Sequence, residues 1–289
     1  MSRASKSVPA ATRRDRRSAE RASHRERHRE RPSLWRGPLP YVAAVVLIVG
    51  AIAWSVLSSR GGPAPTLTGA ASEAVVASLT SIPADVFDRV GSGGIADPLR
   101  TTTFEALRGP SGLPLVIYVG AEYCPFCASE KWSVVAALAR FGAFQGLELS
   151  TSSSTDAFPD TPTLTFRNAS YKSTFIELSA IETADRQGRP IASTTPVQQA
   201  AMDRSDAQGS IPFVSVADRR VAVGTGYRPD VLAGKTWAQI AEAMRDPSTP
   251  LARGVIGNAN WITAAICEQT SGQPSSVCAS PAVRSLSAR

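Results

Sequence analysis

Two cysteines separated by two residues, Cys124 and Cys127, stand where an apolar run meets an expected helix. Cysteines at this spacing can form a redox centre, half of a zinc site, or a short structural disulfide. At the first turn of a helix, the helix dipole and the free N–H groups stabilise a thiolate. We therefore expect Cys124 to be a nucleophile. Cys127, nearly one turn further on and buried deeper, would be the resolving thiol that attacks a mixed disulfide.

The only other cysteines in the sequence are Cys267 and Cys278. Four cysteines allow three pairings, and we expect each cysteine to pair with its neighbour in sequence. A bridge between Cys267 and Cys278 closes a loop of about a dozen residues and stabilises the fold by up to roughly 3 kcal/mol. We expect this bridge to be structural. The alternative is a relay that passes electrons to the first pair.

The positions of the histidines limit the chemistry of the chain after residue 40. Both histidines, His24 and His28, lie in the N-terminal tail. A Cys-His or Ser-His-Asp hydrolase in the later region would therefore need another base. An all-thiolate zinc site is disfavoured because Cys267 and Cys278 lack the short spacing of a zinc knuckle. Copper is disfavoured because histidine is absent and methionine is scarce there. We expect no metal and no cofactor.

The net charge of +7 is concentrated at the N-terminus. Residues 1–40 carry twelve Lys or Arg and four acidic residues, whereas the remainder carries 19 basic and 20 acidic residues. A nucleic-acid partner is not expected, because the region that would form a domain is nearly neutral.

An uncharged apolar segment follows the basic tail, at residues 39–57. Its length matches a hydrocarbon core about 30 Å thick, and the positive-inside rule keeps the tail in the cytoplasm. The sequence predicts a single-pass protein of the cytoplasmic membrane, with its N-terminus inside. The alternative is a signal peptide cleaved near residues 69–72. The predicted parts are a disordered tail (1–38), a transmembrane helix (39–58), a linker (59–72) and an extracytoplasmic domain (73–289).

The exported region shows an alternation of helix and strand patterns, which predicts an α/β fold with a small mixed sheet. We expect two short helices separated at Pro83, a buried strand within residues 112–120, a helix from Pro125 to about Phe141, strands at 147–149 and 163–166, a strand within 173–181, a hairpin turning at 218–220, a helix capped by Thr236, and a last helix containing Cys267.

These features resemble the thioredoxin-like superfamily, in which a buried strand leads into a CxxC that opens a helix. Pro212, in "GSIPFVSV", matches the proline that begins a later strand. The resemblance implies a thioredoxin-like fold with an insertion between the second core strand and the Pro212 strand. It also implies a cis Ile211–Pro212 bond that faces the CxxC.

A closer resemblance is to a membrane-anchored thioredoxin-like family of unassigned function. It is carried by "GAEYCPFCASEKW", "IPFVSV" and "NANWITAAICEQTSGQPSSVC", and spans about residues 80–278. Thioredoxins tend to bury an acid six residues before the nucleophile, where this sequence has Tyr118. Glu122 and Glu130 are the nearby carboxylates that could move a proton, and we place Glu122 in the candidate catalytic set. For each, an exposed carboxylate without a catalytic role is the favoured interpretation.

The sequence thus predicts an extracytoplasmic thiol-disulfide oxidoreductase that acts on cysteine-containing exported proteins. The superfamily resemblance suggests a membrane thiol oxidase as its electron partner. The first alternative is a non-catalytic thioredoxin-like module that binds proteins and has only structural disulfides. The second is peroxide reduction by Cys124, which would pass through a sulfenic acid.

Overall fold

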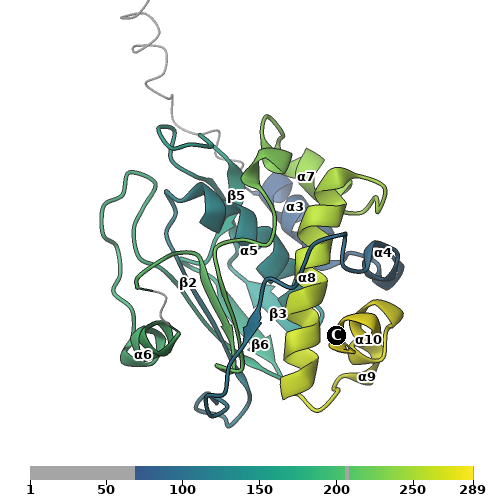
Figure 1. The fold of residues 1–289 in the computed structure, drawn as a ribbon. Helices are drawn as coiled ribbons and strands as arrows, with labels where there is room; N and C mark the ends of the chain where they lie inside the picture. The colour runs from purple at the N-terminus through teal and green to yellow at the C-terminus, as the bar shows by residue number, and fades with distance from the viewer. Residues whose placement is uncertain (1–68, 206–207, 289) are drawn as a thin grey trace, which may run out of the picture. The chain divides into compact units, whose positions relative to one another are not determined.

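A mixed five-stranded β-sheet lies at the centre of the structure (Figure 1). The computed structural model describes residues 69–205 and 208–288. The strand order is β1-β9-β8-β2-β7, in which β2 and β7 are parallel and the other neighbours are antiparallel. The strands are β1 (Arg100–Thr101), β2 (Leu115–Gly120), β7 (Glu177–Glu182), β8 (Phe213–Val216) and β9 (Arg220–Val223). The predicted α/β class with a mixed sheet is confirmed.

Strand β2 is buried along its whole length, as its continuous apolar sequence predicts. Ile117 packs into a small cluster with Ala201 and Met202 of α6 (Pro196–Arg204). Val116 and Tyr118, on the other face, belong to the main core. Because side chains alternate along a strand, a strand covered on both faces needs apolar residues at nearly every position.

The helices divide between the two faces of the sheet (Figure 1). Helix α6 lies on one face, while α5 and α8 pack against each other on the opposite side. Smaller helices surround α8, and α4 and α10 both contact it. Besides α6, the described helices are α3 (Ala70–Thr80), α4 (Ala84–Val90), α5 (Pro125–Leu138), the 3-10 helix η1 (Pro229–Leu232), α7 (Trp237–Ala243), α8 (Pro250–Gln269), α9 (Ser275–Cys278) and α10 (Pro281–Ser287).

Two short antiparallel ladders occupy the segment between α5 and β7. One pairs β4 (Glu148–Thr151) with β5 (Pro162–Thr165), and the other pairs β3 (Gly142–Gln145) with β6 (Ser170–Ser173). The Nε1–H of Trp132 donates to the carbonyl of Pro162 at 2.9 Å, and the Thr163 hydroxyl donates to the carbonyl of Ala128 at 2.7 Å. These bonds hold β5 against α5, the helix that follows the CxxC.

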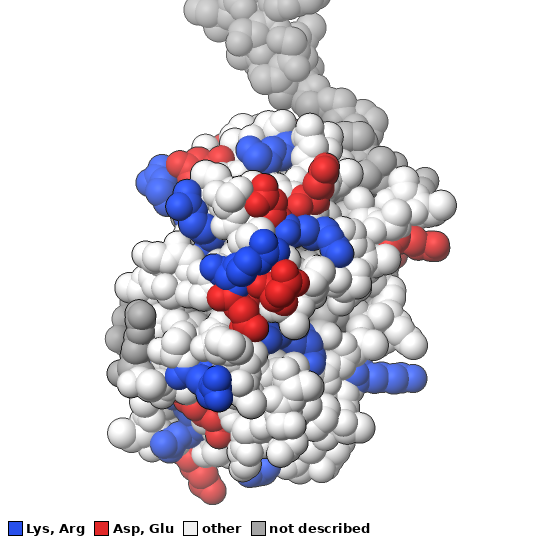
Figure 2. Space-filling model, turned by 90° about the vertical axis from the view of Figure 1, so that its right-hand side faces the viewer, with Lys and Arg blue, Asp and Glu red and all other residues white. Residues whose placement is uncertain are grey.

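The surface carries both signs of charge. On the face shown in Figure 2, Lys and Arg side chains are interspersed with Asp and Glu. This distribution agrees with the nearly equal numbers of basic and acidic residues after residue 40.

The predicted tail and transmembrane helix lie outside the described residues, as does most of the linker. Within residues 69–205 and 208–288, no helix combines the length and the apolar character needed to cross a membrane. Helix α3 begins at Ala70, inside the last residues of the predicted linker.

Candidate functional site

Cys124 and Cys127 lie at the junction between β2 and α5. Pro125 takes the first position of α5, where the missing N–H leaves no bond unmade. Cys124 is the N-cap residue, and its Sγ accepts a hydrogen bond from the backbone N–H of Cys127 at 3.3 Å. Both side chains are present as thiols, so the expected bridge between these two cysteines is not formed in the structure; Cys124 is 7% exposed and Cys127 is 0% exposed. The structure therefore gives Cys124 the outer position and Cys127 the inner one.

The two thiols differ in acidity. Hydrogen bonding by Cys127 lowers the pKa of Cys124 below its ordinary value, and outweighs the opposing effect of burial. Burial raises the pKa of Cys127 well above its ordinary value. The positive charge of Lys131 lowers the pKa of both thiols. Cys124 is thus the thiol that ionises first, as a nucleophile must.

Lys131 forms a buried ion pair that sequence analysis did not identify. Its Nζ lies 2.9 Å from Oε1 of Glu182, and the two side chains are 0% and 1% exposed. Lys131 is one helical turn after Cys127, while Glu182 ends β7 in register with Gly120 of β2. The Oε2 atom of Glu182 is buried without a hydrogen-bond partner among the described residues. The ion pair therefore places the Lys131 ammonium group and the Oε2 acceptor of Glu182 in the interior behind the CxxC.

Glu122 and Glu130 are both buried, so the expectation of exposed carboxylates is wrong for each. The Oε1 atom of Glu122 accepts a hydrogen bond from the Thr165 hydroxyl at 2.7 Å. The Oε2 atom of Glu130 accepts one from Nδ2 of Asn258, on α8, at 2.8 Å. Each carboxylate thus has a hydrogen-bond donor from an element distant in sequence. The donor to Glu122 comes from β5, and the donor to Glu130 comes from α8.

The acidity of the buried acids is set mainly by burial. Burial raises the pKa of Glu182; the charge of Glu122 adds to the rise, whereas Lys131 opposes it. Burial also raises the pKa of Glu130 from 4.5 to about 8, against the opposing effect of its hydrogen bonds. Glu130 is therefore mainly neutral at pH 7.

Tyr118 lies on β2, six residues before Cys124. Its hydroxyl donates to the carbonyl of Cys127 at 3.4 Å, and burial raises its pKa well above the ordinary value. Tyr118 therefore stays protonated. It can position the backbone of the resolving cysteine, but it cannot serve as a carboxylate base.

We expect Glu130→Gln to flatten the pH dependence of stability. Between pH 4.5 and about 8, folded Glu130 holds a proton that the unfolded chain has released. Stability therefore falls as the pH rises through this window. Urea unfolding at pH 6 and pH 8 should show a smaller loss for Glu130→Gln than for the unsubstituted protein. Exposed Glu73 on α3 provides the control, because Glu73→Gln should leave the loss unchanged. Equal losses in all three proteins would contradict the assignment.

Pro212 lies at the same edge of the sheet as the CxxC. The Ile211–Pro212 bond is cis, as predicted. Because Phe213 of β8 is opposite Val119 of β2, the beginning of β8 meets the end of β2, from which the chain continues to Cys124. The carbonyl of Pro212 accepts a hydrogen bond from Gly224 at 2.8 Å, which joins this edge to the end of β9.

Cys267 and Cys278 form a disulfide with a Cα–Cα distance of 5.5 Å, so the predicted pairing of these two residues is confirmed. The bridge joins the last turn of α8 to α9, and both cysteines are buried. Its structural role stays a prediction, as does the alternative of an electron relay.

Metal ligands are not grouped in the described part of the chain. Within residues 69–205 and 208–288, no three His, Cys, Asp or Glu side chains are arranged to hold a metal ion.

Comparison with known proteins gives one match. Residues 109–205 match a family described as a domain of unknown function (DUF929). No curated protein and no solved structure matches the chain. The matched segment, about a third of the sequence, includes the CxxC and the Lys131–Glu182 pair but ends before Pro212.

Proposed function

We propose that the chain is a thiol-disulfide oxidoreductase of thioredoxin-like fold, in which Cys124 attacks and Cys127 resolves. The observation that carries this proposal is the asymmetry of the pair. Cys124 caps α5 with a lowered pKa, while Cys127 is fully buried with a raised pKa. An inert disulfide would require no such difference between its two sulfurs.

The arrangement of the sheet supports the thioredoxin-like assignment. Strand β2 leads directly into the CxxC and α5, and β8 begins beside the end of β2, after a cis proline. Strand β7, parallel to β2, and the β8–β9 hairpin complete a mixed sheet with helices on both faces. The buried strand before the CxxC, the helix that the CxxC opens and the cis proline before a later strand are the features that the resemblance implied.

The proposed reaction is a pair of thiol-disulfide exchanges. The Cys124 thiolate attacks one sulfur of a substrate disulfide, the substrate S–S bond breaks, and the departing sulfur takes up a proton. The Cys127 thiolate then attacks Sγ of Cys124, which releases the second substrate thiol and leaves a Cys124–Cys127 disulfide. The substrate gains two electrons and the CxxC loses two. The reverse sequence oxidises a substrate dithiol.

Cys127 must lose its proton before it can attack, and its surroundings oppose the charge. Lys131 is the cation whose charge favours both thiolates. Glu182 contacts Lys131, and its Oε2 atom is buried without a hydrogen-bond partner in residues 69–205 and 208–288. We assign this ion pair the role of supporting ionisation of Cys127. Glu122, whose charge acts on Glu182, would influence the pair rather than the thiols directly.

Alkylation rates test the proposal against the alternative of a non-catalytic binding module. The reduced chain is treated with iodoacetamide from pH 5 to pH 10, and modification of each cysteine is followed by mass spectrometry. We expect the Cys124 rate to reach half its maximum below about pH 8.5, and Cys127 to react more slowly than Cys124 throughout this range, because it is buried and its pKa is raised. The urea-unfolded chain provides the control, because both thiols should then titrate normally. An inaccessible or ordinary Cys124 would favour the binding module.

The proposed setting is the outer side of the cytoplasmic membrane, with cysteine-containing exported proteins as substrates and a membrane thiol oxidase as electron partner. This proposal depends on the basic tail and the apolar segment at residues 39–57, together with the resemblance.

A further inference from the structure

A cavity of about 250 Å³ lies between the ends of α3, α4 and α5 and the short helix α9. Most of its walls are apolar, and they include Leu79, Phe87, Ala136 and Val277. Arg140, just after α5, is the one charged residue among the described residues that line it. An apolar cavity with a single cation is suited to a ligand that has an anionic group and an apolar body.

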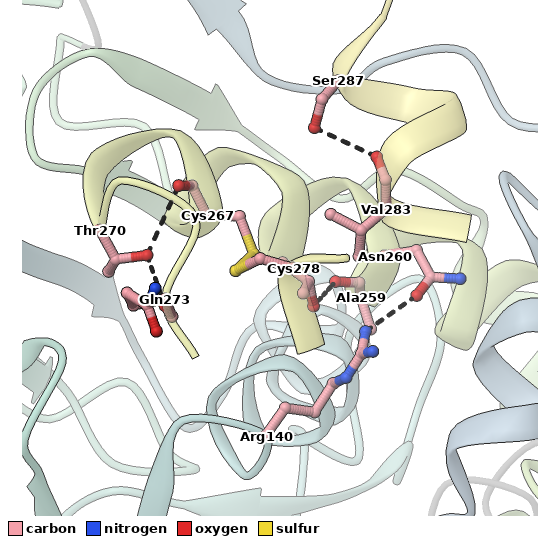
Figure 3. The surroundings of a disulfide bond; sticks show 10 residues. Arg140, Ala259, Asn260, Cys267, Thr270, Gln273, Cys278, Val283 and Ser287 are labelled. Atoms are coloured by element: carbon pink, nitrogen blue, oxygen red, sulfur yellow. Dashed lines mark hydrogen bonds between the residues drawn. A yellow bond between two sulfur atoms is a disulfide. The ribbon is translucent and has the colours of Figure 1, made fainter. Parts of the chain in front are cut away.

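The guanidinium of Arg140 is held in place but is not neutralised. It stacks over the Phe87 ring, with Cζ 4.3 Å from the ring centroid, and Nη1 donates to Oδ1 of Asn260 at 3.3 Å. Figure 3 shows Arg140 directed toward Asn260. That is its one side-chain hydrogen bond within the described part of the chain, and no carboxylate there forms an ion pair with it. Nε and Nη2 form no hydrogen bond to the described part of the chain.

The electrostatic surroundings favour an anion at this position. Burial lowers the pKa of Arg140 to about 10, so the side chain is still a cation at pH 7. Asp88 acts on it from beyond ion-pair distance, and the Oδ1 atom of Asp88 accepts a hydrogen bond from the Ala282 amide at 3.1 Å. A partly desolvated cation with no carboxylate at ion-pair distance is unfavourable. A carboxylate that accepts two parallel N–H bonds would remove this penalty.

We propose that this cavity binds a small monocarboxylate with a short alkyl chain, whose carboxylate pairs with Arg140. The alkyl chain would pack against Leu79, Phe87 and Val277. The limited volume favours a short chain over a full-length fatty acid. Phosphate is a poorer match, because one guanidinium cannot compensate the loss of water around a doubly charged group. The site is independent of the proposed thiol chemistry.

The disulfide secures one wall of this cavity. Ser276 and Val277 belong to α9, directly before Cys278, which is bonded to Cys267 at the end of α8. Figure 3 shows this bridge beside the Arg140–Asn260 contact. Because α9 has only four residues, its position depends on this bridge. Cys267→Ser/Cys278→Ser should therefore weaken ligand binding.

The test uses the full chain in lipid nanodiscs and octanoate labelled with 13C at the carboxyl carbon. Binding is followed by NMR, with empty nanodiscs as the blank. We expect one saturable site and a shifted carboxyl resonance. Octanol, with the same chain and no charge, should bind at least about 10-fold more weakly. Arg140→Gln should weaken octanoate binding about 10- to 100-fold and leave octanol unchanged.

Three further variants complete the test. Arg253→Gln, at an exposed position of α8, should bind octanoate normally. Arg140→Lys keeps the charge and should lie between the native protein and Arg140→Gln. Val277→Trp places a larger side chain in the cavity and should weaken the binding of octanoate. This variant tests whether octanoate binds in the cavity if Arg140→Gln does not fold. Absence of saturable binding at millimolar octanoate, equal affinity for octanol, or unchanged binding by Arg140→Gln and Val277→Trp would overturn the proposal.

Discussion

Replacing Lys131 with methionine should lower the free energy of unfolding by about 3–5 kcal/mol at pH 8. The substitution leaves Glu182, which is 1% exposed, without its counter-ion. Methionine retains much of the volume of the lysine stem, so the loss comes mainly from burying Glu182 without its counter-ion and not from a cavity. Equilibrium denaturation in urea measures the change.

Two comparisons separate the charge effect from general disruption. Lys131→Met/Glu182→Met removes both charges and should recover most of the lost stability. Arg89→Met breaks an ion pair on α4, where Arg89 and Asp85 are 59% and 66% exposed, and should cost no more than about 1 kcal/mol. If Lys131→Met costs as little as Arg89→Met, or if the double variant is no more stable than Lys131→Met, the buried pair is not the source of the effect.

The loss in Lys131→Met should grow as the pH rises. Burial already raises the pKa of Glu182, and removal of Lys131 withdraws the main opposing charge. The folded variant therefore keeps a proton on Glu182 that the unfolded chain releases near pH 4.5, so the variant loses stability as the pH rises above that value. The variant should also ionise Cys124 at higher pH, because Lys131 lowers the pKa of that thiol. A purely structural lysine would leave the alkylation profile of Cys124 unchanged.

Local sequence signals account for the elements that position the cysteines. The apolar run before the CxxC predicted β2, and Pro125 predicted the start of α5. The predicted hairpin corresponds to β8 and β9, which are joined by the three residues 217–219, and Ala217 and Asp218 in this turn have positive φ. Thr236 caps α7 as expected, and Gln239 completes a capping box. Each signal lies within the element that it predicts.

One local signal was overlooked. Thr195, Pro196 and Gln198 begin α6 with a capping box of the same kind, although no helix was predicted there. Helix α6 covers the face of the sheet opposite α5. It supplies the side chains against which the apolar residues on that face of β2 pack.

The features that could not be predicted depend on partners far away in the sequence. Lys131 and Glu182 are 51 residues apart, and each alone resembles a surface charge. Strand β7 lies beside β2, although β4 and β5 come earlier in the chain, because those two strands pair with each other outside the main sheet. Glu122 and Glu130 were misjudged for the same reason, since their burial is decided by β5 and α8.

Replacing either cysteine of the CxxC should abolish turnover, but only one replacement should trap a partner. Cys124→Ser removes the nucleophile and should reduce disulfide exchange by on the order of 10³-fold or more. Cys127→Ser leaves Cys124 able to attack, but the mixed disulfide can no longer be resolved from within the protein. Non-reducing electrophoresis of the full chain, after reaction with a disulfide-bonded protein, should show covalent adducts for Cys127→Ser and none for Cys124→Ser.

The second cysteine pair distinguishes structural support from electron relay. Cys267→Ser/Cys278→Ser should lower stability, because the bridge fixes α9 to α8. If the bridge is structural, this variant should still exchange disulfides at the native rate under conditions where it is folded. A relay would instead leave the first half-reaction intact and slow re-reduction of the Cys124–Cys127 disulfide. The disulfide variant can also be combined with Cys127→Ser. If this triple variant still forms adducts through Cys124, the CxxC reacts with substrate without help from Cys267 and Cys278.

If Cys127→Ser forms no adduct at all, the proposed mechanism is wrong, because every later step depends on attack by an accessible Cys124 thiolate.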